Sequence, residues 1–358
     1  MARLTRAQTQ ERNRTKVLAA ARAEFTERGF RDAKIDVIAE RAELTRGAVY
    51  SNFPGKRALY FAVLAEEARR FADGPRTAGP PACSAAEVLG ALARTWVARL
   101  PLATDPDARL GVDLLPEILA DELTHRPYAQ LLRFEAIVFG LVLERLSPPD
   151  REDGRLVRVA EAAFTMLHGA SQLAAAAPGF GEPFNVVHAC ESLPSLRFED
   201  SWPEPPIVSR ARAAGQPWTP PEAVDALRAG PVRLHGDGVV AVLGLHRLSA
   251  IEEAVRAAFS TDEVTLAVVT GQPGELVPLV ALVLADLRGL LRRSCPDSTW
   301  PRLRVVLDDT GALAAAAGIS AVSDATEAAI RIEGGRIVVR AEGFGACHAA
   351  ATRVPGQA

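Results

Sequence analysis

Residues 34–59 constrain the fold more than any other stretch of this chain, because two short helical patterns follow one another across a tight turn. In the first pattern, apolar side chains recur on one helix face at Ile35, Ile38, Ala39 and Ala42. In the second pattern, Val49 and Phe53 lie one turn apart. The two faces can bury their apolar residues against each other, so this stretch predicts a compact helix pair followed at once by a further helix.

The second helix of this pair leaves an outer surface with donors, one flat ring and little bulk at its start. Its outward positions are Arg46, Gly47, Tyr50, Ser51 and Asn52. Thr45 precedes the helix, where its hydroxyl can accept a hydrogen bond from a free backbone N–H. The positive helix end and Arg46 then point the same way, and such a surface suits a DNA groove.

The order of these parts resembles the TetR family of bacterial transcription regulators. The matching stretches are VLAAARAEFTERGF (17–30), VIAERAELTRGAVYSNF (37–53) and GKRALY (55–60). The resemblance implies a three-helix DNA-binding domain with a helix-turn-helix in its second and third helices. It also implies that Thr45, Arg46, Gly47, Tyr50 and Asn52 face a palindromic operator in double-stranded DNA, and that Lys56 meets a phosphate.

Two positions depart from the family pattern. Glu43 stands where the family often has the turn glycine, so a residue with a Cβ has to adopt a positive φ, which costs free energy. Its charge also lies close to the expected DNA. Lys34 replaces a small hydroxyl residue at the start of the second helix, so a charged contact to phosphate would replace a hydroxyl contact.

Composition favours a multidomain protein with a local basic module. A chain of 358 residues is long enough for two or three domains. The formal net charge is −3, yet the first 57 residues carry an excess of Lys and Arg, which fits attraction to DNA phosphates. The start of the chain does not read as a signal sequence, and no run of about 18 apolar residues appears. We therefore expect a cytoplasmic protein with no membrane partner.

The expected division is a helix-turn-helix domain (1–60), an all-α ligand-binding and dimerisation domain (61–200), a proline-rich linker (201–222) and an α/β domain (223–358). Residues 1–14 are polar and predict a disordered arm, ahead of a first helix that ends at Gly29. Further helical patterns span 56–72, 85–100, 107–123, 126–146 and 154–177.

The resemblance implies that the all-α region binds a small-molecule effector and forms a homodimer, and a palindromic operator also requires a two-fold partner. We assign the interface to residues 156–177 and 183–196. Candidates for the ligand pocket are polar or aromatic residues among apolar neighbours: Trp96, Asp113, Glu117, Phe134, Thr165, His168 and Gln172. The alternatives are a core or interface role for His168, the core for Phe134, and the dimer seam for Gln172.

The C-terminal region changes pattern. The linker ends in Thr219-Pro-Pro-Glu222, a capping-box sequence for a helix start. Apolar strands then alternate with helices, which predicts a sheet covered on both faces, and a hairpin turns at Gly334-Gly335. The order, with VVLDDTGALAAAAGI (305–319) running into AAIRIEGGRIVVRAEGF (328–344), resembles a thioredoxin-like domain of the peroxiredoxin type.

This second resemblance departs from its family in its chemistry. His246, Arg247, Leu248 and Ser249 stand where that family places a reactive cysteine at a helix start, and Ser249 is expected to cap the helix. Without the thiol there is no such chemistry, and neither Cys295 nor Cys347 replaces it by spacing. We expect a degenerate, non-catalytic fold whose four cysteines are reduced and structural. Asp308-Asp309 ends a strand, where it could form a ligand or metal site or cap the next helix.

These patterns predict an all-α helix-turn-helix domain, an all-α ligand-binding and dimerisation domain, and an α/β thioredoxin-like domain. The predicted function is a ligand-responsive repressor, not an enzyme, that binds its operator as a dimer and is released by an effector, with no cofactor and no metal. One alternative is a DNA-targeted redox or enzymatic protein that acts through the C-terminal domain. Another is an adaptor that binds a protein through that domain.

Overall fold

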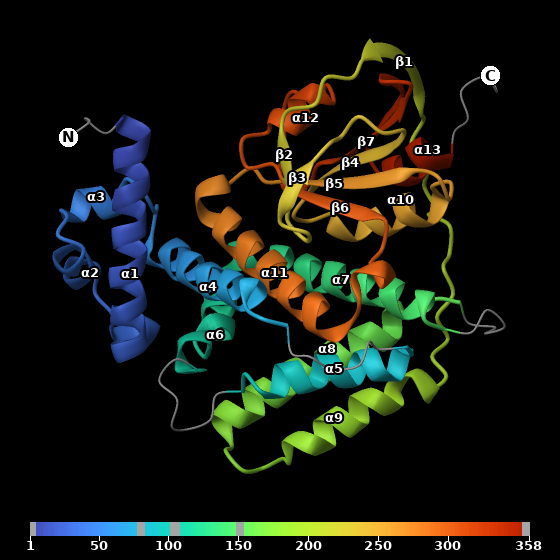
Figure 1. Cartoon of the computed structure of the whole chain (residues 1–358). Helices are drawn as coiled ribbons and strands as arrows, with labels where there is room; N and C mark the ends of the chain where they lie inside the picture. Colours follow the sequence, from blue (N-terminus) through green and yellow to red (C-terminus); the bar gives the residue numbers. More distant parts are fainter. Residues whose placement is uncertain (1–4, 77–82, 101–107, 148–153, 353–358) are drawn as a thin grey trace.

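The computed structural model describes residues 5–76, 83–100, 108–147 and 154–352. Its N-terminal helices are α1 (Arg6–Asp32), α2 (Ile35–Arg41), α3 (Arg46–Tyr50) and α4 (Lys56–Asp73) (Figure 1). The prediction of a disordered arm is wrong for residues 6–14, which belong to α1. A capping box starts this helix early, since Thr5 and Gln8 exchange side-chain to backbone hydrogen bonds of 3.2 and 2.9 Å. Gly29, with a φ of 73°, kinks α1 near its end.

The helical body follows. Its elements are α5 (Ala85–Val97), η1 (Ala108–Gly111), α6 (Leu114–Leu119), α7 (Glu122–Arg145), α8 (Val157–Ala176), α9 (Pro183–Ser192) and η2 (Leu193–Ser195). The pattern at 107–123 is two short elements, η1 and α6, and not one helix. Helix α7 starts earlier than its pattern indicated because Asp121 caps it by accepting a hydrogen bond from the Leu123 N–H at 3.0 Å.

The C-terminal part is an α/β domain. Its strands are β1 (Arg212–Pro217), β2 (Ala223–Asp225), β3 (Gly230–Val232), β4 (Gly238–Gly244), β5 (Glu263–Val269), β6 (Leu303–Leu307), β7 (Glu327–Glu333) and β8 (Arg336–Glu342). Its helices are η3 (Leu248–Ala250), α10 (Ile251–Ala257), α11 (Pro273–Ser294), η4 (Asp297–Thr299), α12 (Ala312–Ala316) and α13 (Ala346–Thr352).

The main sheet has the order β1-β8-β7-β4-β5-β6, in which β4, β5 and β6 are parallel and the other neighbours are antiparallel. Residues 212–217 of the expected linker form its edge strand β1. The capping-box prediction at 219–222 is wrong, because strand β2 follows it and not a helix. The hairpin between β7 and β8 turns at Gly334 and Gly335, both with positive φ, as predicted.

Side chains of β4 alternate between two cores. Val239, Ala241 and Leu243 join the core that contains α10 and α11, whereas Val240 and Val242 pack with residues of α12. The sheet is therefore covered on both faces, which confirms the prediction from its apolar strands.

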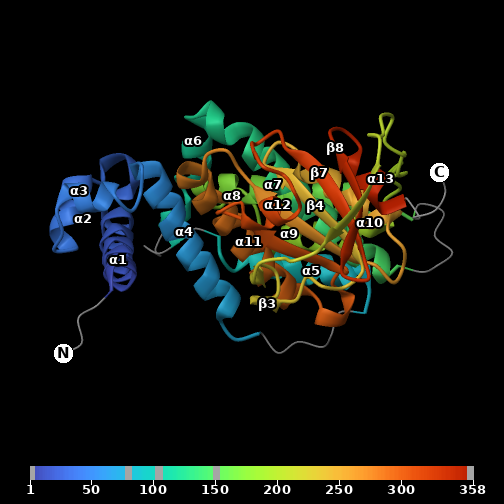
Figure 2. The same cartoon turned by 90° about the horizontal axis from the view of Figure 1, so that it is seen from above.

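Helix α11 joins the α/β domain to the rest of the chain. It connects the parallel strands β5 and β6, and it also packs along α4, as Figures 1 and 2 both show. Gly289 permits this close approach, since a Cβ there would lie 2.5 Å from the ring of Phe71. That ring lies between the guanidinium groups of Arg99 and Arg293, at 4.1 and 3.9 Å from its centroid. One apolar core consequently extends from the N-terminal helices into the α/β domain.

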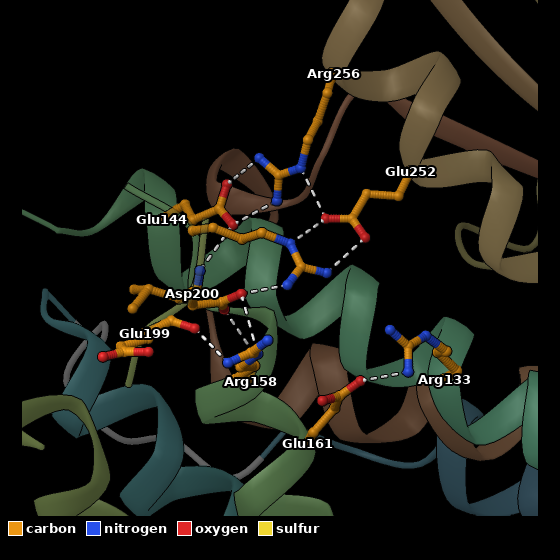
Figure 3. Close-up of polar contacts among 10 residues, drawn as sticks. Arg133, Glu144, Arg158, Glu161, Glu199, Asp200, Glu252 and Arg256 are labelled. Atoms are coloured by element: carbon orange, nitrogen blue, oxygen red, sulfur yellow. Dashed lines mark hydrogen bonds and ion pairs between the residues drawn. The ribbon is translucent and has the colours of Figure 1, made fainter. Parts of the chain in front are cut away.

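A buried ionic cluster also ties the α/β domain to the helical body (Figure 3). Arg155, just before α8, donates two hydrogen bonds of 2.7 and 2.8 Å to Glu252 of α10 and another to Asp200. Arg256 of α10 donates to Glu252 at 2.7 Å and to Glu144 of α7 at 2.8 Å. The side chains of Arg155, Asp200 and Glu252 are buried, so this cluster holds α10 against α7 and the start of α8.

We expect Arg155→Met to lower the free energy of unfolding by about 3 kcal/mol, because Asp200 and Glu252 stay buried without this partner. Arg133→Met is the matched control: its 3.2 Å pair with Glu161, also drawn in Figure 3, is half exposed and is worth about 0–1 kcal/mol. Denaturant unfolding of the full-length variants measures both changes. Equal losses in the two variants would contradict a structural role for the cluster.

Candidate nucleic-acid interface and ligand cavity

The pair α2 and α3 packs as its apolar spacing predicts. Ile38, Ala39 and Val49 are buried, as are Ala42 and Phe53. Glu43, in the turn between the helices, has a φ of 56°, which confirms the positive φ expected at this position of the turn. The turn is closed by the N–H of Leu44, which donates to the carbonyl of Ala39 at 3.0 Å. This geometry fixes the direction of α3.

Most of the predicted DNA-facing residues lie exposed along α3: Thr45, Arg46, Gly47, Tyr50 and Ser51. Thr45 accepts a hydrogen bond of 3.2 Å from the N–H of Ala48, so it caps α3 as predicted. Arg46 lies 5.6 Å from the centroid of the Tyr50 ring and pairs with Asp36 at 3.2 Å. The exposed surface of α3 thus presents a guanidinium beside an aromatic ring.

The other predicted contacts have local partners. Asn52 is half-buried and donates its amide to the carbonyl of Ala48 at 2.8 Å. Lys56 donates to the carbonyl of Arg31 at 3.1 Å and lies over the ring of Phe30, and burial lowers the pKa of its ammonium. Lys34 is exposed at the start of α2. Contact between Lys56 and a phosphate therefore requires the lysine to leave its present partners.

Lys16 is a residue that the sequence reasoning missed. It pairs with Glu43 at 2.6 Å, and this hydrogen bond lowers the pKa of the Glu43 carboxyl. The negative charge expected near the DNA is therefore offset within the domain. Lys16 and Glu43 are 27 residues apart in the sequence. Lys16 lies on α1, and only packing brings it to the turn, so the sequence contains no local pattern that marks this pair.

A cavity of about 560 Å³ lies between the helical body and α11. Three of the seven predicted ligand residues line it, namely Trp96, His168 and Gln172. The Nδ1 of His168 lies 3.1 Å from the carbonyl of Phe164, which can only accept, so Nδ1 carries the hydrogen and Nε2 faces the Tyr128 hydroxyl at 3.4 Å. Burial lowers the pKa of His168, so this ring is neutral at pH 7.

The other four predicted ligand residues lie away from the cavity. Phe134 is buried in the core, and Thr165 is exposed and donates to the carbonyl of Glu161. Asp113 accepts a hydrogen bond of 2.8 Å from the N–H of Phe30 at the end of α1, and Glu117 pairs with Arg57 of α4 at 3.3 Å. The two acids therefore tie the η1–α6 segment to the N-terminal helices.

The η1–α6 segment has a second side, which faces the cavity. Leu110, Leu114 and Leu115 line the cavity wall, and the carbonyl of Leu110 accepts a 2.5 Å hydrogen bond from the buried Tyr60 hydroxyl of α4. One short segment thus contacts both the cavity and the helices that carry α3.

The α/β domain has no reactive thiol where the resemblance would place one. Burial raises the pKa of Cys295 to about 11 and raises that of Cys347 well above its usual value. Asp308 accepts hydrogen bonds from the N–H groups of Leu313 and Ala314 at 3.1 and 2.8 Å, so it caps the next helix, the second of the two roles considered for it. In the described ranges, every helix is too short or too polar to cross a bilayer.

The N-terminal unit is a helix-turn-helix domain by geometry. Its residues 17–63 match the family model for bacterial regulatory proteins of the tetR family, so this domain is a TetR-family helix-turn-helix domain. Two relatives from Pseudomonas putida, the HTH-type transcriptional regulator SrpR and the uncharacterized HTH-type transcriptional regulator TtgW, are each 46% identical to this chain over 65 residues, 18% of its length. The alignments span 30% of SrpR and 48% of TtgW.

Solved structures give a weaker likeness. A TetR transcriptional regulator from Rhodococcus sp. RHA1 aligns with 52% of this chain and 97% of its own, at 16% identity and a TM-score of 0.35. The fatty acid degradation regulator FadR from Bacillus halodurans aligns with 51% of this chain and 99% of its own, at 15% identity and a TM-score of 0.26. Scores this low do not establish a common fold for the rest of the chain.

We expect Glu43→Gly to raise the midpoint of thermal unfolding by about 1–4 °C, because glycine adopts the positive φ without the Cβ clash. Glu40→Gly, three residues earlier in α2, should lower the midpoint by a similar amount, since glycine weakens a helix interior. Differential scanning calorimetry of both variants makes the comparison. A fall in the midpoint for both would contradict strain at Glu43, since the exposed Lys16–Glu43 pair that is also lost contributes little to stability.

Proposed function

We propose that this chain is a transcription regulator that binds double-stranded DNA through helix α3 and acts in the cytoplasm. The observation that carries the proposal is the exposed Arg46–Tyr50 surface on the capped second helix of a TetR-family helix-turn-helix domain. Ordinary B-DNA has a major groove that admits one α-helix, and arginine is the commonest reader of guanine in it. The pairing of Lys16 with Glu43 supports the proposal, since it offsets an acid beside that surface.

We further propose that the protein is a homodimer and that its two α3 helices read a palindromic operator. The assigned interface is the outer face of residues 156–177 and 183–196. The inner face of α8 is buried within the subunit, but large apolar side chains remain exposed near its end, in the connection to α9 and on α9: Leu173 at 45%, Phe180 at 74% and Phe184 at 73%. An apolar patch of this kind favours contact with a second subunit.

The cavity in the helical body is the proposed effector site, and release from DNA by the effector makes the protein a repressor. The η1–α6 segment would carry the signal. A ligand that displaces Leu110 or Leu114 shifts the backbone that also holds Asp113 and Glu117 against α1 and α4. A ligand changes DNA affinity only if it binds the two states unequally, and this segment gives it a physical way to do so.

For the C-terminal domain we propose a degenerate thioredoxin-like fold with no catalytic role. Support comes from the parallel pair β4 and β5 joined through α10, followed by the antiparallel pair β7 and β8 and helix α13. The start of α10, where a thiol would react, is packed on the helical body. There the N–H of Ser249 donates to the side chain of Gln130 on α7 at 3.0 Å, and Ser249 does not form the side-chain cap predicted from the sequence.

We expect Arg46→Ala to weaken binding to a duplex selected by the wild-type protein from random DNA by about tenfold or more, with a smaller loss for Tyr50→Ala. Arg94→Ala is the matched control, because it removes the same charge from α5, where Arg94 forms an exposed pair with Glu191 of α9. Fluorescence anisotropy at fixed salt measures the three affinities. Unchanged binding in both α3 variants would rule out α3 as the reading helix.

We expect the double variant Leu173→Asp and Phe184→Asp to convert the dimer to a monomer, because two charges would have to be buried at the assigned interface. Phe344→Asp is the control, since Phe344 is 60% exposed on the α/β domain. Size-exclusion chromatography with light scattering gives the mass of each. A dimer that survives the double variant, or a wild-type monomer, would contradict the assigned interface.

A further inference from the structure

The cavity wall contains a buried acid with no hydrogen-bond donor in the part of the chain that the structure describes. Glu135 lies on α7, is 4% exposed and lines the cavity. Among the described residues, none donates a hydrogen bond to its carboxyl group. A buried polar group usually has a partner, so a carboxyl group that faces an open space indicates a ligand that supplies one.

A second acid enters the same cavity from the α/β domain. Asp286 of α11 lines the wall together with Leu282 and Val283, and it pairs with Arg99 at 2.6 Å. Burial raises the pKa of Glu135 well above its usual value, and the nearby charge of Asp286 raises it further, while Arg99 opposes them. These shifts favour the neutral form of the Glu135 carboxyl group in the empty cavity, and a positive charge would favour its ionised form.

The rest of the wall favours a cation with an apolar body over an anion. Its aromatic side chains are Phe71, Trp96 and Tyr128, whose ring faces attract cations. Among the described residues of the wall, Arg99 has the cationic side chain. Its guanidinium group already pairs with Asp286 and lies over the Phe71 ring. His168 is neutral, and Glu67, the third acid, pairs with Arg22 at 2.5 Å.

We propose that this cavity binds a lipophilic monocation, an aromatic or alkyl amine in its protonated form, whose ammonium group lies at Glu135 and Asp286. The inference rests on the proposed effector role of the cavity, and it names the ligand class. It also assigns a role to the appended domain: through α11 that domain supplies one of the two acids and part of the apolar wall, so it is part of the sensor. A volume of about 560 Å³ falls in the range of small-molecule sites.

The test compares three ligands with the same apolar body, 4-phenylbutylamine, 4-phenylbutanol and 4-phenylbutanoate, by isothermal titration calorimetry with the full-length protein. We expect the amine to bind at least tenfold more tightly than the alcohol, and the carboxylate to bind most weakly. Amine affinity should rise from pH 6 to pH 8, because Glu135 must lose its proton to pair with the ammonium group. The titratable and charged side chains around Glu135 are Asp286, Glu67, Arg99, His168 and Tyr128. Burial lowers the pKa of His168 and raises that of Tyr128, and both shifts favour the neutral ring.

Glu135→Gln should lower amine affinity at least tenfold and remove its pH dependence, while alcohol affinity stays the same. Asp286→Asn should cause a smaller loss. Glu161→Gln, which alters the half-exposed pair between Glu161 of α8 and Arg133 of α7 outside the cavity, is the matched control and should change nothing. Unchanged alcohol binding shows that each variant keeps its fold.

Two kinds of result would overturn the proposal. In the first, the alcohol or the carboxylate binds as tightly as the amine. In the second, amine binding is absent at millimolar concentration or is unchanged in Glu135→Gln. Both results are read without DNA. A failure here would leave the DNA-binding proposal intact, and a failure of operator binding would leave the amine site intact.

Discussion

The packing of α11 along α4 is the contact on which the rest of the structure depends. Helix α11 is the crossover between β5 and β6, so the sheet fixes its position, while α4 runs directly out of the helix-turn-helix domain. Gly289 brings the two helices close enough for Phe71 to be held between two guanidinium groups. An apolar helix shared by two layers makes the α/β domain inseparable from the helical body, because separating them would expose one continuous core.

This arrangement places the proposed sensor at a junction. The cavity wall is built from α4, α5, α7 and α8 on one side and α11 on another, and the η1–α6 segment connects it to the N-terminal helices through Asp113 and Glu117. The buried cluster around Arg155 keeps α10 on α7. A ligand in the proposed site would therefore contact a frame held by these packed helices, and the short η1–α6 segment is the part of the wall that also contacts α1 and α4.

Much of the N-terminal domain could be predicted because its determinants are close in the chain. The buried faces of α2 and α3, the Thr45 cap and the positive φ of Glu43 each depend on neighbours within a few turns. The early start of α1 was missed, since its polar face masks the helical pattern although Thr5 and Gln8 form a capping box. In the α/β domain, local patterning predicted the two-sided sheet and the Gly334-Gly335 hairpin, but it mistook the sequence at 219–222 for a helix start.

The sequence by itself determined the helix pair, the exposed surface of α3, the two-sided sheet and the absence of a thiol at the start of α10, because backbone propensity and apolar period are local properties. Only the tertiary structure decided which side chains share a cavity. Glu135 stands within an apolar helical run, and Asp286 lies in a crossover helix of another domain, so neither has a local pattern that marks it as a ligand residue. Asp113 and Glu117 had a suitable pattern but became ties to α1 and α4, since the direction of a short helix follows from what it packs against.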